Sequence, residues 1–414
     1  MLESGQIRRL GEWIHAERRL ELLTAGFPLL PAGHHAVEGD LPWIFWDMCP
    51  SGFLGKRFAR LERGLSLNAE PRTWGRDEAL RALTEAGDDL PGSLIIGERS
   101  LARWQEARAR EASWELEADR FHRGEIDAAP GLARSAGGSV VVGRRPWDPP
   151  EEIDAWLTAE SSYGGSSSLG GERPKLATRT ATGGSLLKFS PPVAPPETPE
   201  WAARRAHFEA TGLMFPATTP QGQRWADLLR VEAHCAQTLR AFGVAAVDAA
   251  AAYSLSGRVV LEIARYDRTP DWGRRGASTL YWYSRERLED VNVPAPHVVA
   301  RLVSDGHLDA SAAAIVERVH AFSVAIGNTD AHLGNYGLVF DDQGKASLAP
   351  FYDILPMALA PAHDELPDAR LLPRVGQPAD PTVASWVDEL VRRVSADGEI
   401  SSPFRELWYR HLGR

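Results

Sequence analysis

The sequence has little cysteine, no long apolar run and no excess of basic charge, and each absence removes a class of protein. Cys49 and Cys235 are the only cysteines, so neither a disulfide framework nor a zinc cluster can be proposed, and two buried thiols are expected. No run of about 18 apolar residues occurs, which argues against a membrane-spanning helix. The net charge of −10 argues against a protein that grips nucleic acid over its whole surface. Glu3 and its charged neighbours stand where a signal peptide would be apolar, so a cytoplasmic protein is expected.

What is present is the composition of a large soluble protein. The apolar fraction is 43% and the charged fraction 25%, both ordinary for a folded protein. A chain of 414 residues is long enough for two or three folding units. We predict three domains, over residues 1–135, 136–268 and 269–414. The 14 tryptophans indicate large packed cores rather than a ligand cage.

Helical spacing dominates the first region. Apolar residues between Gln6 and Leu23 recur at helical spacing with charged residues among them, which predicts an amphipathic helix. A second helix is predicted from Phe53 to Leu65. Ser93 to Gly97 is a short strand candidate, and Ser100 to Arg123 is rich in Ala, Glu and Arg, which predicts a solvated helix.

The middle region has the order of elements found in the N-lobe of a protein kinase. A loop of small residues, Ser161 to Gly171, offers N–H and hydroxyl donors that suit a phosphate cradle, although such loops are more often linkers. Strand patterns follow at Lys175 to Ala181 and at Ser185 to Ser190, joined by a turn. Lys188 on the second strand is therefore the candidate for a phosphate contact, because of this order alone.

A helix with a misplaced carboxylate follows. The pattern from Gln223 to Phe242 predicts an amphipathic helix with Glu232 on its apolar side. A carboxylate there is costly unless it finds a partner, and Lys188 is the obvious one. The alternative is that Glu232 lies at the edge of the stripe in solvent. Two strands are predicted next, over Ala245 to Tyr253 and Arg258 to Ile263.

The segment from Asn328 to Asn335 carries the strongest chemical signal. It offers the carboxylate of Asp330 and, five residues later, the amide of Asn335. The catalytic loop of protein kinases has the same step from Asp to Asn, although its His-Arg is replaced here by Asn328 and Thr329. In that loop the Asp accepts the proton of the attacking hydroxyl and the Asn holds Mg²⁺. The alternative is that both are ordinary turn residues.

A hairpin pattern follows this segment and returns a second carboxylate to it. Tyr336 to Phe340 is strand-like, Asp341 to Gly344 is turn material, and Ala346 to Phe351 predicts the returning strand. Residues just outside two paired strands meet at the open end of a hairpin. We therefore expect Asn335 and Asp353 to be neighbours.

Together these residues resemble the HipA family of bacterial serine/threonine kinases, which are the toxins of HipA–HipB type toxin–antitoxin systems. The resemblance is closest to the YjjJ-like branch. It rests on segments spread from about Leu41 to the C-terminus: Leu41–Leu54, Asp47–Gly55, Asp88–Leu94, Ser168–Leu176, Arg265–Arg268, Asn328–Asn335, Ala349–Asp353 and Tyr352–Met357.

The resemblance implies an α+β, protein-kinase-like bilobal fold with a mixed β-sheet N-lobe, an α-helical C-lobe and an extra N-terminal subdomain. It implies ATP and Mg²⁺ as cofactors. Asp330 would be the catalytic base, and Asn335 and Asp353 the Mg²⁺ ligands. The nucleotide would be bound with the help of the following residues: Lys188, Glu232, Ser168, Gly170, Gly171 and His332.

The resemblance also implies regulation and partners. Ser168 aligns with the loop serine that the family autophosphorylates to silence itself, and Ser166 and Ser167 are close enough to substitute. Ile354 and Leu355 follow Asp353, so the Phe-Gly switch of ordinary protein kinases is absent. No helix-turn-helix segment is recognised, so DNA contact is expected only through a separate antitoxin. The substrate would be a protein, with the translation machinery as family precedent.

The same residues are compatible with two other functions. Four side chains could be ligands of the catalytic metal of a nuclease: Asp330, His332, Asn335 and Asp353. The acidic net charge counts against this, and Lys188 and Glu232 would then have no role. The third possibility is a catalytically silent kinase fold that only binds a nucleotide or partner.

Overall fold

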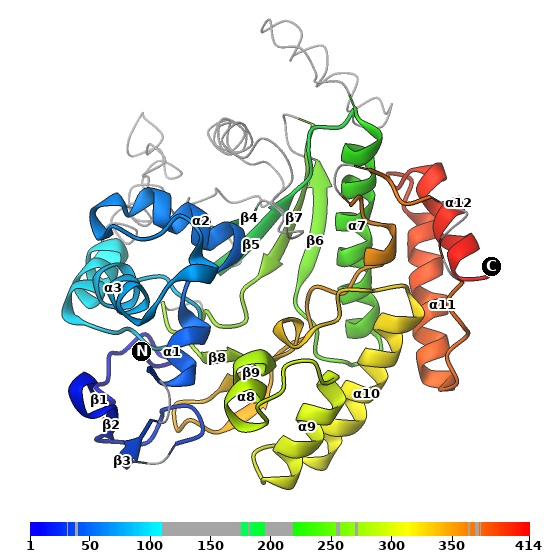
Figure 1. Cartoon of the computed structure of the whole chain (residues 1–414). Coiled ribbons are helices and arrows are strands. Elements are labelled where there is room, and N and C mark those ends of the chain that lie inside the picture. The colour runs from blue at the N-terminus through cyan, green and yellow to red at the C-terminus, as the bar shows by residue number, and fades with distance from the viewer. Residues whose placement is uncertain are drawn as a thin grey trace, which may run out of the picture.

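The computed structural model describes residues 1–30, 32–37, 40–109, 175–180, 183–194, 218–253, 257–269, 272–362, 365–368, 372 and 374–414. These parts form an α+β protein (Figure 1). An N-terminal region lies on one side of a four-stranded sheet, and helices cover the other side. This is the expected division into an N-terminal subdomain, a sheet lobe and a helical lobe, so the predicted fold class is confirmed.

The N-terminal region begins with a small antiparallel sheet. Its strands, in the order β1-β2-β3, are β1 (Gly11–Ile14), β2 (Arg19–Leu22) and β3 (Gly33–Ala36), with the short helix η1 (His15–Glu17) between the first two. The predicted helix from Gln6 to Leu23 is therefore wrong. Leu20 and Leu22 are buried and alternate with more exposed neighbours, a period of two that suits a strand. The chain reverses through Arg18, whose φ is 47°.

Helices complete this region. They are α1 (Trp43–Met48), α2 (Gly52–Leu61) and α3 (Arg76–Ala86), with short 3₁₀ turns η2 (Arg63–Leu65) and η3 (Pro71–Thr73). The helix predicted from Phe53 to Leu65 is thus confirmed as α2 followed by η2. The strand predicted at Ser93 to Gly97 is wrong, because those residues form a loop. Residues 98–109 are helical, as expected for the start of the solvated helix.

A four-stranded antiparallel sheet forms the middle of the molecule, in the order β4-β5-β7-β6. Its strands are β4 (Lys175–Thr180), β5 (Gly183–Phe189), β6 (Ala249–Tyr253) and β7 (Val259–Ala264). Helix α7 (Pro220–Ala241) packs against β5, β6 and β7. The helix starts at Thr219, whose side chain accepts a hydrogen bond from the Gly222 amide, and Pro220 follows in the first turn. All these elements agree with the sequence pattern.

The helical half contains α8 (Leu280–Arg287), α9 (Ala295–Ser304), α10 (Ala310–Ala325), α11 (Pro381–Ala396) and α12 (Ser402–His411), with a 3₁₀ turn, η5 (Met357–Leu359). The predicted hairpin is present as β9 (Gly337–Phe340) and β10 (Ala346–Leu348). A strand that was not predicted, β8 (Gly276–Thr279), pairs with β9 to complete a second three-stranded sheet.

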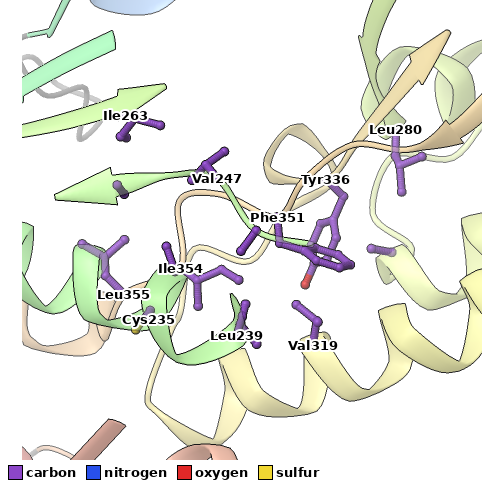
Figure 2. Close-up of a cluster of buried hydrophobic side chains, with 14 of the residues drawn as sticks. Cys235, Leu239, Val247, Ile263, Leu280, Val319, Tyr336, Phe351, Ile354 and Leu355 are labelled. Carbon is purple, nitrogen blue, oxygen red and sulfur yellow. The ribbon is translucent and has the colours of Figure 1, made fainter. Parts of the chain in front are cut away.

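We call the four-stranded sheet together with α7 the sheet half. One hydrophobic core joins this sheet half to the helical half (Figure 2). Cys235 and Leu239 of α7 and Val319 of α10 surround Phe351 and Ile354, which follow the hairpin. The residues on either side of Asp353 are therefore anchored against α7 rather than left in a free loop. Cys235 is buried and Cys49 is partly buried, and both are free thiols.

The N-terminal region also contacts the helical half. The Asp47 carboxylate accepts hydrogen bonds from the Thr279 amide and hydroxyl, each at 2.7 Å, at the corner between β8 and α8. Next to this, the rings of Trp46 and Trp282 stack with centroids 6.0 Å apart. Burial raises the pKa of Asp47 to about 6, although the bonds from Ser278 and Thr279 oppose this rise. Among the described residues, no helix is both long and apolar enough to cross a membrane.

Candidate active site

The sheet and helix α7 meet at a buried ion pair. Lys188, near the end of β5, donates from Nζ to Oε1 of Glu232 at 2.7 Å. The two side chains are only 9% and 5% exposed. The contact expected from the misplaced carboxylate is therefore present, and the alternative of a solvated Glu232 is wrong.

Lys188 holds a second carboxylate at the same time. Its Nζ also donates to Oδ1 of Asp353 at 2.7 Å, across 165 positions of sequence. One ammonium thus joins the sheet, helix α7 and the segment that follows the hairpin. We call Lys188, Glu232 and Asp353 the lysine cluster.

Burial and mutual attraction compete in the lysine cluster. Burial alone would lower the pKa of Lys188, but the charges of Asp353 and Glu232 outweigh it and raise that pKa. Burial raises the pKa of Glu232 to about 7, and Lys188 offsets only part of this rise. Burial alone would also raise the pKa of Asp353, but the charge of Lys188 outweighs burial and lowers this pKa. Asp353 is therefore the firmly ionised carboxylate of the cluster at neutral pH.

The loop from Asn328 to Asn335 is held by its own polar groups. The Asp330 amide donates to Oδ1 of Asn328 at 3.1 Å, and Nδ2 of Asn335 donates to the Asp330 carbonyl at 2.7 Å. Nδ1 of His332 accepts from the Gly334 amide at 3.0 Å, at the start of the 3₁₀ turn η4 (Leu333–Asn335). These bonds fix the backbone on both sides of Asp330 while its side chain remains 56% exposed.

Asp330 lies in an electrostatic setting shaped by its neighbours. Burial raises the pKa of its carboxyl group, His332 opposes this, and the charge of Asp353 adds to the rise. Nε2 of His332 lies 3.8 Å from Oδ1 of Asp330. A carboxylate that is accessible and has a raised pKa is suited to accept a proton from a bound hydroxyl.

The hairpin brings Asp353 back to this loop, as expected. Asn335 and Asp353 line the same small hollow. The Tyr352 hydroxyl donates to the Gly334 carbonyl at 3.0 Å, which ties the two segments together. Asp353 itself has a φ of 58°, a conformation that costs a non-glycine residue energy and that persists where surrounding structure enforces it. Such strained residues are concentrated at functional sites.

The side-chain oxygen atoms at this hollow are of the type that Mg²⁺ prefers. Nδ2 of Asn335 donates to the Asp330 carbonyl, which leaves Oδ1 of Asn335 as the side-chain atom that can bind a metal ion. Asp353 has one carboxylate oxygen held by Lys188 and a second oxygen beside it. Mg²⁺ prefers oxygen ligands and is often held by one or two protein side chains together with water and substrate phosphates. Within the described ranges, no group of three or more His, Cys, Asp or Glu side chains is arranged to hold a metal ion.

A second ionic cluster joins the N-terminal region to the sheet half. Arg265 donates to both carboxylate oxygens of Asp267, each at 3.0 Å. Arg268 donates to Asp267 and to Asp89, each at 2.8 Å, and Asp267 also accepts from the Gly92 amide at 2.9 Å. We call Arg265, Arg268, Asp267 and Asp89 the arginine cluster. Sequence reasoning gave Asp89 no role, although its Asp-Asp-Leu-Pro-Gly segment and the Arg-Tyr-Asp-Arg segment have opposite charges that indicate a contact.

The arginines control the ionisation of this cluster. Burial alone would raise the pKa of Asp89, but Arg265 and Arg268 outweigh it and lower the pKa to about 2. The pKa of Asp267 is lowered for the same reason. These carboxylates stay charged throughout the neutral range.

Several predicted site residues lie outside the described part of the chain. They are the loop residues proposed for phosphate binding and autophosphorylation: Ser166, Ser167, Ser168, Gly170 and Gly171. Their roles stay predictions. Asp330, Asn335, Asp353, Lys188, Glu232 and His332 are described, and the structure brings them together around Asp353 and its hairpin.

Comparison with known proteins assigns the class. Residues 167–389 match the family described as HipA-like C-terminal domain, and residues 1–105 match the one described as YjjJ-like toxin, middle domain. The first match covers more than half of the sequence, so the chain belongs to the HipA-like toxin family.

Individual relatives are distant. The chain is 27% identical to Toxin YjjJ of Escherichia coli (strain K12) over 379 residues, which are 89% of this chain and 72% of that protein. A chain of the Shewanella oneidensis MR-1 complex of HipA, HipB and operator DNA is 13% identical, with a TM-score of 0.48 over 95% of this chain and 90% of that chain. The Helicobacter pylori proinflammatory kinase CtkA is 10% identical, with a TM-score of 0.36 over 60% of this chain and 90% of that one.

Proposed function

We propose that this protein is an ATP- and Mg²⁺-dependent protein serine/threonine kinase of HipA type that acts as a toxin. The observation that carries the proposal is the lysine cluster. A single buried ammonium lies between Glu232 of a helix and Asp353 of the segment after the hairpin. Phosphoryl transfer in kinases uses a lysine–glutamate pair and a metal-binding aspartate in these positions.

The proposed reaction assigns each polar group a task. Asp330 accepts the proton of a serine or threonine hydroxyl, whose oxygen forms a bond to the γ-phosphorus of ATP. The bond from that phosphorus to the bridging oxygen breaks, and ADP leaves. Lys188 contacts the phosphates while Glu232 holds its ammonium in place. Asn335 and Asp353 would hold Mg²⁺, which when bound would neutralise the phosphate charge.

The toxin role and its regulation follow from the family. The N-terminal match is to a domain of a YjjJ-like toxin, and a separate DNA-binding antitoxin would be the partner. Phosphorylation at Ser166, Ser167 or Ser168 would add a charge of about −1.5 to −2 to the loop. That charge would repel the loop from the acidic groups of the site and silence the kinase. The substrate would be a cytoplasmic protein, with the translation machinery as the family's precedent.

Intact-mass spectrometry after incubation with ATP and Mg²⁺ tests the chemistry. Protein shown to start unphosphorylated should gain phosphate, and Asp330→Asn should slow the gain by about 10² to 10⁴-fold, the usual contribution of a general base. Asp305→Asn is the matched control, because Asp305 lies after α9 and pairs with Arg301 at the surface. It should behave like wild type.

Other results would favour the other functions. ATP binding without any phosphate gain in wild type would indicate a catalytically silent kinase fold. Cleavage of DNA or RNA by wild type would indicate a metal-dependent nuclease, if the variants Lys188→Met and Glu232→Gln cleave at the same rate. In a bacterial host, induced wild type should reduce colony formation and Asp330→Asn should not. Equal toxicity of the two would contradict a kinase toxin.

A further inference from the structure

The C-terminal helix α12 has a buried face that meets the start of the loop carrying Asp330. Phe404, Trp408 and His411 follow one another at i, i+4 and i+7, a spacing that places them on one face of the helix. They are only 1%, 0% and 3% exposed. His411 is thus a buried titratable side chain to which the proposed reaction gives no task.

Two side chains of α12 contact the backbone just ahead of Asn328. Nε1 of Trp408 donates to the Ile326 carbonyl at 3.2 Å. The imidazole of His411 lies directly against Gly327, because a Cβ atom at Gly327 would overlap Nε2 and Cδ2 of that ring. The φ of Gly327 is 85°, a conformation that glycine adopts readily and other residues rarely do. Space and backbone conformation both require glycine here, and its small size lets the ring reach the main chain.

The contacted backbone leads straight to Asp330. The Asn328 amide donates to the Ser323 carbonyl at 2.9 Å, and Oδ1 of Asn328 accepts from the Asp330 amide at 3.1 Å. Asn328 is 7% exposed, so it has little room to adjust. A shift of Gly327 would therefore be passed on to Asp330. The far end of the loop is held by a separate contact, the bond from the Tyr352 hydroxyl to the Gly334 carbonyl.

The other end of α12 is tied to the helix that carries Glu232. Ser401, the N-cap of α12, donates to the Asp227 carboxylate of α7 from its amide at 2.9 Å and from its hydroxyl at 2.6 Å. The guanidinium of Arg224, also on α7, lies over the ring of Phe404 at 5.7 Å from the centroid. Helix α12 thus links α7 to the start of the loop.

We propose that Trp408 and His411 are positioning residues, which hold the start of the loop so that Asp330 reaches the hydroxyl to be phosphorylated. The inference rests on the proposed function, in which Asp330 is the base. A general base must lie within hydrogen-bond reach of the proton that it accepts, about 2.6–3.2 Å between heavy atoms. A small displacement of the loop is therefore enough to slow the reaction.

Rates of phosphate gain, followed by intact-mass spectrometry at a series of ATP concentrations, test the inference. His411→Ala should lower the maximal rate about 100-fold, the cost of displacing a reacting group by about 1 Å. The ATP concentration that gives half of this rate should not change, because Lys188 and Asp353 are held by other contacts. His411→Gln should recover part of the rate, since its amide can take the place of Nε2. His297→Ala, the same substitution at an exposed position of α9, is the control and should behave like wild type.

Hydrogen exchange gives a second readout that does not depend on catalysis. In His411→Ala the amides of Asn328 and Asp330 should exchange faster than in wild type, because the loop would open more often. The amides of strand β9, beyond the far end of the loop, should exchange at an unchanged rate. Trp408→Phe removes the donor to Ile326 and should change exchange and rate in the same direction.

The outcomes separate this inference from the proposed function. If wild type gains phosphate and folded His411→Ala gains it as fast, the positioning role is wrong and the kinase assignment stands. A rise in the half-saturating ATP concentration that accompanies the loss of rate would indicate general loosening of the nucleotide site and would also overturn the inference. If wild type gains no phosphate, the proposed function fails, and the exchange measurement alone decides whether α12 holds the loop. Thermal unfolding verifies that each variant is folded, and Trp408→Phe takes the place of His411→Ala if the latter is not.

Discussion

The lysine cluster and the arginine cluster are both largely buried, yet their cations make different kinds of contact. The arginine cluster makes bidentate, multiply bonded contacts that fix the N-terminal region to the sheet half. The lysine cluster holds two carboxylates with one point charge. Arginine presents its donors in a rigid planar fork, whereas lysine presents three rotatable donors on a flexible stem. The comparison indicates that arginine joins two regions of this chain through fixed, paired contacts, while the ammonium of Lys188 suits the phosphate contact proposed for it.

The largest expected effect comes from breaking the arginine cluster. Asp267→Asn leaves two largely buried arginines without their main counter-charge, which should lower the free energy of unfolding by about 3–5 kcal/mol. Urea unfolding followed by tryptophan fluorescence measures this. Asp305→Asn on the surface should show no measurable change. An Asp267→Asn variant as stable as wild type would mean that the cluster is not the permanent joint described here.

Replacing an arginine of one cluster by lysine, and the lysine of the other by arginine, tests whether the type of cation matters. Arg268→Lys should lower the free energy of unfolding by about 1–3 kcal/mol, because one ammonium cannot replace the bonds to Asp267 and Asp89. Lys188→Arg should remain folded but bind ATP about tenfold more weakly, because a fork locked onto two carboxylates is less free to meet phosphate. Urea unfolding and calorimetric titration measure the two effects. Normal ATP affinity in Lys188→Arg would contradict the argument for an ammonium.

The smallest effect is a difference in pH dependence between the clusters. The pKa of Glu232 is raised from an ordinary 4.5 to about 7, so the folded state binds its proton more tightly, and stability falls as pH rises through this window. The pKa of Asp89 is lowered from 3.8 to about 2, so its contribution is present above pH 4 and is lost as pH falls toward 2.

Urea unfolding at pH 5 and pH 7.5 separates these contributions. Glu232→Gln should lose more stability relative to wild type at pH 5 than at pH 7.5, because only wild type gains from protonation at the lower pH. Asp89→Asn should differ from wild type equally at both pH values, since Asp89 is charged at each. The same difference for Glu232→Gln at the two pH values would show that Glu232 does not titrate between them.

Two contacts of the site could be predicted from the local pattern of the sequence. The hairpin places Asp353 beside Asn335 because period-two strands flank a polar turn, and β9 and β10 have this form. The Lys188–Glu232 contact follows from the cost of a carboxylate on an apolar helix face. The Lys188–Asp353 and Arg268–Asp89 contacts span 165 and 179 positions, and periodicity has no information about such pairs.

The errors in the fold have a different origin. The segment from Gln6 to Leu23 has both helical and alternating character, and two four-residue strands with a short turn can imitate a helix in sequence. Tertiary pairing decided the outcome, since β2 is paired on both sides by β1 and β3. Strand β8 was missed because Gly276 to Thr279 carries little apolar signal of its own and is fixed by its pairing with β9.

The N-terminal region touches both halves of the molecule, through the arginine cluster on one side and the Asp47–Thr279 contact on the other. It therefore braces the sheet half against the helical half. Any displacement of one half relative to the N-terminal region must strain or release one of these two contacts. The relative placement of the two halves thus depends on a region that supplies none of the proposed catalytic groups, so substitutions at Asp89 or Asp47 should alter the affinity of the proposed site for a nucleotide.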